Sequence, residues 1–233
     1  MAKTQITIID IARELHISPS TVSRALRNHP DISRKTVEIV KECAERLSYK
    51  PNETALSLRL GRNNIIGVIV PEIVHYFFSS IVQGIEEVAF AEGFNVLLFR
   101  SEESYMKELK ITESLINARV AGVLASVSKE TDRYEHFQQI LDNNIQLVLY
   151  DRICIGIITD RVVVDDYSGA LTAVEHLIQT GCKRIAFYSS PLHLEISKNR
   201  KNGYLDALRK NGFPVDESLM YVCDTRDKAI ELT

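Results

Sequence analysis

The chain of 233 residues is missing the patterns that mark several large protein classes. It has no run of about 18 apolar residues, so a membrane span is not expected, and no apolar stretch of a signal peptide follows its N-terminus. Its four cysteines lie far apart and form no CxxC pair, which argues against a metal site. These absences predict a cytoplasmic protein with reduced thiols.

The fingerprints of many enzymes are absent as well. Neither GxGxxG nor GxxxxGK[ST] occurs, so a nucleotide cofactor has no support, and no GxSxG elbow offers a nucleophile. The neighbouring carboxylates Asp165–Asp166 and Glu86–Glu87 point in diverging directions, so an acid–base pair is not expected from either. We therefore expect no catalytic residues, no cofactor and no metal.

The net charge of −3 is distributed unevenly. Residues 1–62 contain 11 Lys and Arg against 7 Asp and Glu, whereas the remainder contains 17 against 24. Apolar residues make up 45% of the chain, which is enough for a sizeable core. A basic head on an acidic body favours a small DNA-binding module attached to a domain with another task.

The head has the signature of two short helices joined by a tight turn. Thr7 and Asp10 form a capping box, and Ser18 is a second N-cap with Pro19 at the first helical position. A third helix is expected over residues 33–47. This order is that of a helix-turn-helix, whose second helix enters the major groove of double-stranded DNA. The alternative is a generic three-helix bundle with a solvated polar face.

The body changes to short β-branched runs that alternate with amphipathic helices. This alternation predicts βα units with parallel sheets. A first set has strands at 65–70, 95–99, 120–125 and 146–150 and helices at 79–92, 104–117 and 133–143. A second set has strands at 161–164, 184–189 and 219–222 and helices at 167–180 and 198–210, and residues 224–231 resemble the opening of another helix.

Three segments together resemble one family. They are residues 7–12 (TIIDIA), 17–28 (ISPSTVSRALRN) and 44–52 (AERLSYKPN), which are similar to the head of the lactose/galactose repressor (LacI/GalR) family. The similarity continues through the body. It implies an all-α helix-turn-helix head and an α/β, periplasmic-binding-protein-like body with parallel sheets flanked by helices.

The resemblance implies how the head reads DNA. By position, Pro19, Ser20 and Arg24 would contact bases, and Arg24 can bond the O6 and N7 edge of guanine. Residues 51–62 would form a hinge that folds on the operator and drives a leucine into the minor groove. The expected DNA-binding set is Thr7, Pro19, Ser20, Thr21, Ser23, Arg24, Asn28, Leu58 and Arg59, with Thr21, Ser23 and Asn28 on phosphates.

For the body, the resemblance implies a small effector, a carbohydrate, in a cleft between two α/β subdomains. The matching positions are Phe77, Phe78, Ser126, Ser128, Asp151 and Arg200. A carboxylate, a guanidinium and an aromatic face suit a polyhydroxyl ligand. Each position has an alternative: the phenylalanines as core, Asp151 in an ion pair with Arg152, and Arg200 as a solvated helix residue.

The expected organisation is a head at 1–50, a hinge at 51–62, a first subdomain at 63–161 and an incomplete second subdomain at 162–233. The chain ends at roughly two-thirds of the family's usual length. The resemblance implies a nucleoid-associated repressor that binds a pseudo-palindromic operator as a homodimer. The alternative is a truncated receptor or decoy without effective operator binding.

Overall fold

The computed structural model describes residues 6–49, 63–74, 76–223 and 225–232. The chain divides into two compact units, Met1–Gly61 and Arg62–Thr233, which we call the head and the body. The expected hinge, with Leu58 and Arg59, lies outside the described residues. Head and body are therefore treated separately below.

The head is built from three helices, as expected. They are α1 (Ile8–Glu14), α2 (Pro19–Leu26) and α3 (Arg34–Arg46). Ile11, Val22 and Val40, one from each helix, are completely buried and form the centre of a small apolar core. Because all three helices contribute to this core, the position of α2 is fixed by packing against α1 and α3.

Two caps set where the first helices begin. The Asp10 carboxylate accepts hydrogen bonds from the Thr7 backbone N–H at 2.9 Å and from the Thr7 hydroxyl at 2.7 Å. The Ser18 hydroxyl accepts the Thr21 N–H at 3.1 Å, and Pro19 occupies the first turn of α2. Both caps satisfy backbone or side-chain groups that a helix end leaves unpaired.

The body contains a five-stranded parallel sheet, the first sheet. Its strands are β1 (Ile65–Val70), β2 (Asn95–Arg100), β3 (Gly122–Ala125), β4 (Gln146–Tyr150) and β5 (Asp160–Val162). Their order is β2-β1-β3-β4-β5, and every pair is parallel. The expected grouping of the 161–164 strand with the second set is wrong, because β5 pairs with β4.

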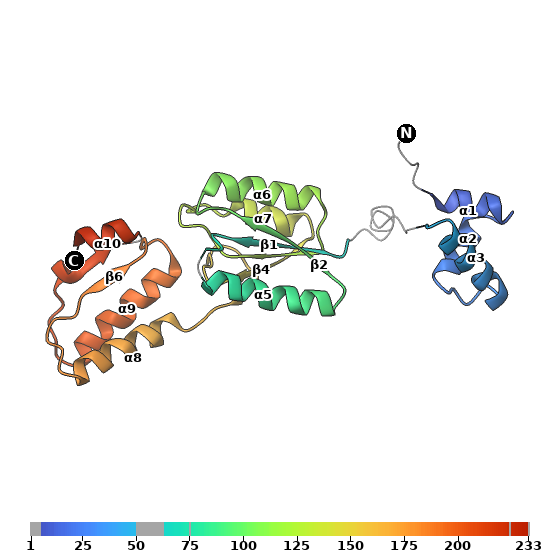
Figure 1. Ribbon diagram of the computed structural model, residues 1–233. Helices are drawn as coiled ribbons and strands as arrows, with labels where there is room; N and C mark the ends of the chain where they lie inside the picture. Colours follow the sequence, from blue (N-terminus) through green and yellow to red (C-terminus); the bar gives the residue numbers. More distant parts are fainter. Residues whose placement is uncertain (1–5, 50–62, 75, 224, 233) are drawn as a thin grey trace. The chain divides into compact units, whose positions relative to one another are not determined.

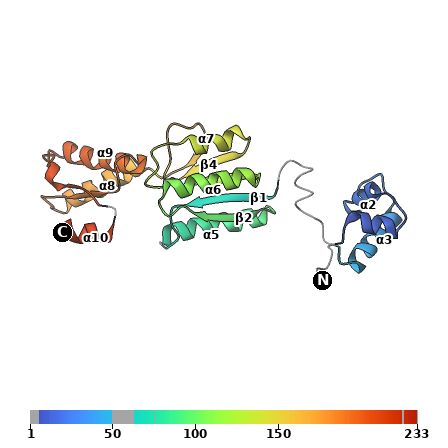
Figure 2. The same ribbon diagram turned by 90° about the horizontal axis from the view of Figure 1, so that it is seen from above.

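Helices cover both faces of the first sheet. They are α5 (Tyr76–Ala91) on one face and α6 (Tyr105–Asn117) and α7 (Glu135–Asp142) on the other, as Figures 1 and 2 show. Along β1, Ile69 faces the α6–α7 core, whereas Val68 and Val70 face the α5 core. This alternation explains why β1 is apolar throughout, since a strand covered on both faces has no polar side.

A second sheet follows, with two parallel strands. It consists of β6 (Phe187–Ser189) and β7 (Met220–Val222), and the helices around it are α8 (Asp166–Gln179), α9 (Glu195–Lys210) and α10 (Arg226–Leu232). A 3₁₀ turn, Glu217–Leu219, precedes β7. Gly203 lets α8 and α9 meet closely, because a Cβ there would lie 2.9 Å from the Leu171 backbone nitrogen.

Two helices begin earlier than the sequence predicts. Helix α5 begins at Tyr76 and not at residue 79, so Phe77 and Phe78 lie in its first turn. Helix α9 begins at Glu195 and not at residue 198, which places Arg200 in its second turn. Helix starts without a strong capping residue are poorly marked in a sequence, and Leu194, the N-cap of α9, makes no side-chain cap.

Candidate functional site

The outer face of α2 presents the side chains expected to read DNA. Pro19, Ser20 and Arg24 are exposed, and Thr21 and Ser23 are half-buried. Arg24 leaves 55% of its side chain accessible, and its only described ionic neighbour is the exposed Asp31, at 3.9 Å. An exposed ion pair at this distance is weak, so the guanidinium can exchange Asp31 for a base edge.

A group of hydroxyls surrounds the start of α2. The Ser18 oxygen lies 2.7 Å from the Ser20 oxygen and 2.8 Å from the Thr21 oxygen, in addition to capping the helix. Arg27, which the sequence reasoning did not single out, donates to the Ser23 hydroxyl at 2.7 Å and to the Ser23 carbonyl at 3.1 Å. Ser23 is therefore already engaged within the helix, and Arg27 adds a cation to this face.

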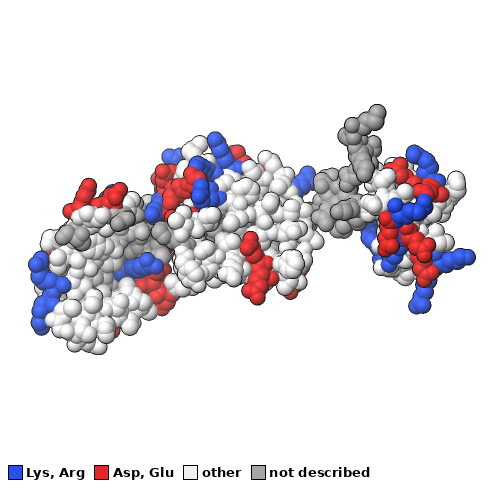
Figure 3. Space-filling view, in the orientation of Figure 1, with Lys and Arg blue, Asp and Glu red and all other residues white. Residues whose placement is uncertain are grey.

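The other described residues of the expected DNA-binding set lie at helix ends. Thr7 caps α1, and Asn28 follows α2 with a φ of 54°. Asparagine adopts this left-handed conformation more readily than most residues. Figure 3 shows Lys and Arg interspersed with Asp and Glu on the visible face of the head, so the positive charge there is not continuous.

The expected effector residues of the first sheet follow the carboxyl ends of its strands. Ser126 and Ser128 come after β3, and Asp151 comes directly after β4. The chain order reverses between β1 and β3, which is the switch point where open α/β sheets bind ligands. Ser126 and Ser128 are completely buried, and within the described part of the chain the Ser126 hydroxyl has no hydrogen-bond partner.

The two phenylalanines separate in role. Phe78 is only 4% exposed and packs with Val68, Val70 and Val82 in the core under α5, which is the alternative interpretation. Phe77 is 53% exposed and contacts the Phe78 ring edge-on, with ring centres 5.2 Å apart. An exposed aromatic ring therefore remains beside the carboxyl end of β1, where it could cover a sugar.

The Asp151 carboxyl is affected both by burial and by nearby positive charges. Its φ of 55° turns the chain at the end of β4, and its N–H donates to the Val162 carbonyl at 3.0 Å. Burial raises the pKa of the Asp151 carboxyl above its ordinary value, and the positive charges of Arg152 and Arg200 partly offset this. Arg200 itself donates from Nε to Asp166 at 2.7 Å and is half-exposed.

The expected alternative of an Asp151–Arg152 ion pair is not what the structure shows. Arg152 donates from Nη1 to both oxygens of Glu103, at 2.7 and 2.9 Å. Its guanidinium carbon also lies 5.8 Å from the centre of the Phe78 ring. Arg152 is thus held by Glu103 from the segment after β2, and Asp151 is left without a described ion-pair partner.

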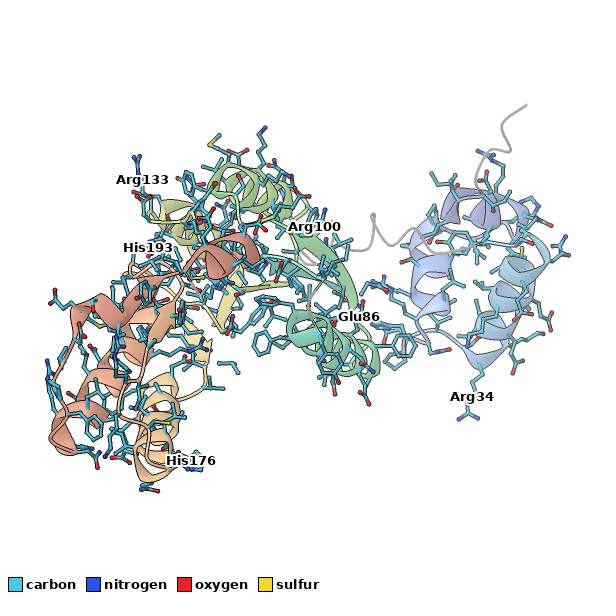
Figure 4. All side chains as sticks on the ribbon, turned by 60° about the vertical axis from the view of Figure 1, so that its left-hand side comes forward. Arg34, Glu86, Arg100, Arg133, His176 and His193 are labelled. Atoms are coloured by element: carbon cyan, nitrogen blue, oxygen red, sulfur yellow. The ribbon has the colours of Figure 1, made fainter. Side chains whose placement is uncertain are left out.

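Sequence reasoning missed a buried acid and its partners behind these loops. Glu108 is completely buried on α6 and binds Ser128, Thr131 and His136. A glutamate in the first turn of an amphipathic helix gave no signal, because such positions usually face solvent. Arg133, just before α7, instead extends away from the fold in Figure 4 and does not contribute to this edge.

The described residues contain neither a metal site nor a membrane span. No group of three or more His, Cys, Asp or Glu side chains there could hold a metal ion. Among the described helices, none has the length and apolar character needed to cross a membrane.

The geometry defines a class of protein: a helix-turn-helix head on a body of the periplasmic-binding-protein kind. Family models match both parts. The model of bacterial regulatory proteins of the lacI family matches residues 7–52, and that of periplasmic binding proteins and the sugar binding domain of the LacI family matches residues 63–232. The chain belongs to the LacI family, whose members are DNA-binding transcriptional regulators and not enzymes.

Individual relatives agree with this assignment. The chain is 33% identical to catabolite control protein A of Priestia megaterium, over 97% of this chain and 68% of that protein. It is 31% identical to the transcriptional regulator GalR of Escherichia coli, over 92% of this chain and 62% of that protein. The chain thus spans roughly two-thirds of the length of these curated relatives.

Solved structures show the same fold. A lac repressor dimer bound to operator and an anti-inducer matches with a TM-score of 0.76 at 22% identity, covering 94% of this chain and 65% of that chain. A transcriptional regulator CelR–cellobiose complex matches with a TM-score of 0.64 at 26% identity, covering 98% and 69%.

Proposed function

We propose that this chain is a repressor subunit that binds a pseudo-palindromic operator as a homodimer and responds to a small carbohydrate. The observation that carries the DNA part is the capped α2, whose exposed face presents Pro19, Ser20 and Arg24. Base-reading side chains on the first turns of a recognition helix reach the major groove. Because its partner is chromosomal DNA, we place it at the nucleoid.

Exposed apolar side chains on α5 and β2 support the dimer. Val88 and Phe90 near the end of α5 are 66% and 84% exposed, and Leu97 and Leu98 on the edge strand β2 are each more than a third exposed. Large apolar side chains that stay exposed in one chain are commonly covered by a protein partner. A twofold dimer would carry two heads, one for each half of a palindrome.

The carbohydrate part rests on the edge of the first sheet. Asp151 can accept from two sugar hydroxyls, and Phe77 offers an exposed aromatic face. The Ser126 hydroxyl after β3 is completely buried and has no hydrogen-bond partner among the described residues. Two relatives point the same way by name: the ribose operon repressor of Halalkalibacterium halodurans and the CelR–cellobiose complex. The ligand would shift the protein between two binding states.

The first test selects bound sequences from a random duplex DNA pool with the 233-residue chain. A palindrome with an easily kinked pyrimidine–purine centre is the expected result. Recovery of a half-site alone would contradict the dimer and favour the decoy alternative, and no enrichment would contradict operator binding. The matched variant Arg24→Ala should change the preferred base at one position per half-site, whereas Arg13→Ala, exposed on α1, should leave the motif unchanged.

A further inference from the structure

Two glutamates hold consecutive backbone groups of the segment after β3. Glu108 Oε2 accepts the Ser128 N–H at 2.8 Å, and Glu103 Oε2 accepts the Lys129 N–H at 2.8 Å. Glu103 lies between β2 and α6 and Glu108 lies in the first turn of α6, so side chains that follow β2 fix a loop that follows β3. We call residues 126–131 the β3 loop.

Glu108 makes four hydrogen bonds in a completely buried position. Besides the Ser128 N–H, it accepts the Ser128 hydroxyl at 2.8 Å, the Thr131 hydroxyl at 2.6 Å and His136 Nε2 at 3.0 Å. Each carboxylate oxygen thus receives two donors. A buried carboxylate is tolerated when its oxygens are saturated in this way.

The positions of the protons follow from this bonding. Ser128 donates its only hydroxyl proton to Glu108. The Ser101 hydroxyl, whose oxygen lies 2.6 Å from the Ser128 oxygen, must therefore donate to Ser128. His136 Nε2 faces a carboxylate oxygen and must carry a proton. His136 Nδ1 is buried without a hydrogen-bond partner among the described residues, so a second ring proton would be an unsatisfied buried donor.

We propose that Glu103 and Glu108 are positioning residues of the effector site, which clamp the β3 loop in one conformation before any ligand binds. His136 completes the clamp as a neutral imidazole protonated on Nε2. The clamp reaches both polar groups expected to meet a sugar: Ser126 lies two residues before Ser128, and Asp151 precedes Arg152, which Glu103 holds at 2.7 Å. This role rests on the proposed carbohydrate function, because a loop ordered in advance costs the ligand less entropy.

The first test is the tautomer of His136, read by ¹⁵N NMR of the imidazole in the full 233-residue chain. In wild type we expect a neutral ring with its proton on Nε2. In Glu108→Gln the amide oxygen must face Ser128, whose N–H can only donate, so the amide NH₂ faces Thr131 and His136. An Nε2 proton would face the amide NH₂, donor against donor, which costs more than one buried Nδ1 proton without a partner, so Nε2 should accept and the ring proton should move to Nδ1.

The matched control is Glu113→Gln, the same change at an exposed position of the same helix. It should leave the His136 ring as in wild type. A purely space-filling role for Glu108 predicts no tautomer change in Glu108→Gln either, because glutamine has nearly the same shape. A wild-type ring that is doubly protonated or protonated on Nδ1 would overturn the proposal.

Amide hydrogen exchange tests the two backbone hydrogen bonds of the clamp, Glu108 to Ser128 and Glu103 to Lys129, separately. Replacing a charged acceptor by a neutral one weakens the bond, so Glu108→Gln should speed exchange at Ser128 about tenfold, and Glu103→Gln should do the same at Lys129. Each variant should affect the other amide less. If either variant fails to fold, the wild-type protein still tests the clamp. Its His136 ring should carry the proton on Nε2, and the Ser128 and Lys129 amides should exchange slowly; fast exchange at these amides would refute the clamp.

A ligand titration separates this proposal from the proposed function. D-ribose, D-galactose and cellobiose are added to each protein, and the amide shifts around Ser126 and Asp151 are followed. We expect at least tenfold weaker binding in Glu103→Gln and Glu108→Gln than in Glu113→Gln, and equal binding would refute a positioning role. If no sugar binds wild type, the proposed carbohydrate effector loses its support. The tautomer of His136 and the exchange rates of the Ser128 and Lys129 amides still test whether the clamp exists.

Discussion

Replacing Gly203 by alanine should destabilise the part of the body formed by α8, α9 and the second sheet. A Cβ at this position would meet the Tyr167 carbonyl oxygen, the Leu171 nitrogen at 2.9 Å and the Ala170 Cβ at 3.1 Å. Two of these three atoms belong to the backbone of α8 and cannot move as a side chain does. The two helices must therefore separate, and the core around Tyr204 and Leu208 must loosen with them.

The magnitude follows from two opposing effects. Alanine favours a helix interior over glycine by about 1 kcal/mol. Overpacking costs about 1–3 kcal/mol, and a clash with backbone belongs at the upper end of that range. The net loss in the free energy of unfolding should be about 2 kcal/mol, measured by urea denaturation followed by circular dichroism.

The matched control is Gly169→Ala on α8, where a new Cβ would meet nothing within 4 Å. That variant should be as stable as wild type or slightly more stable. If Gly203→Ala is also as stable as wild type, the close approach of α8 and α9 does not exist as described, and the reasoning is refuted.

Three further changes test the head and the sheet edge. Arg24→Ala should weaken binding to the selected operator by roughly 1–3 kcal/mol in a fluorescence titration, and equal weakening on unrelated DNA would rule out base reading. Ser18→Ala removes the cap of α2 and should lower head stability by about 1 kcal/mol in thermal unfolding, whereas an unchanged melting temperature would contradict the cap. Asp151→Asn should stabilise the body at neutral pH. Burial raises the pKa of the Asp151 carboxyl in the folded protein above its value in the unfolded chain. Stability is therefore lost as the pH rises from the pKa of the unfolded state through the pKa of the folded state, because ionisation of Asp151 then opposes folding. The advantage of Asp151→Asn in thermal unfolding should therefore vanish in acid, and a pH-independent difference would show that the charge is not its cause.

The sequence by itself determined most of the head. Ser18, Pro19 and the spacing of Ile11 and Val22 are local signals, because a cap and a helical stripe depend on residues within one or two turns. The helices they predict are present within a residue or two. The strands 65–70 and 146–150 were likewise predicted with their observed bounds, since both are β-branched or apolar runs with clear ends.

Only the tertiary structure decided which strands share a sheet and which polar residues meet. No local signal says that β5 pairs with β4, that Arg152 turns to Glu103, or that Glu108 is buried behind the β3 loop. These pairings join residues that are 12 to 49 positions apart. The free energy of each depends on desolvation and on partners brought by packing, so the choice is made only when the sheet has assembled.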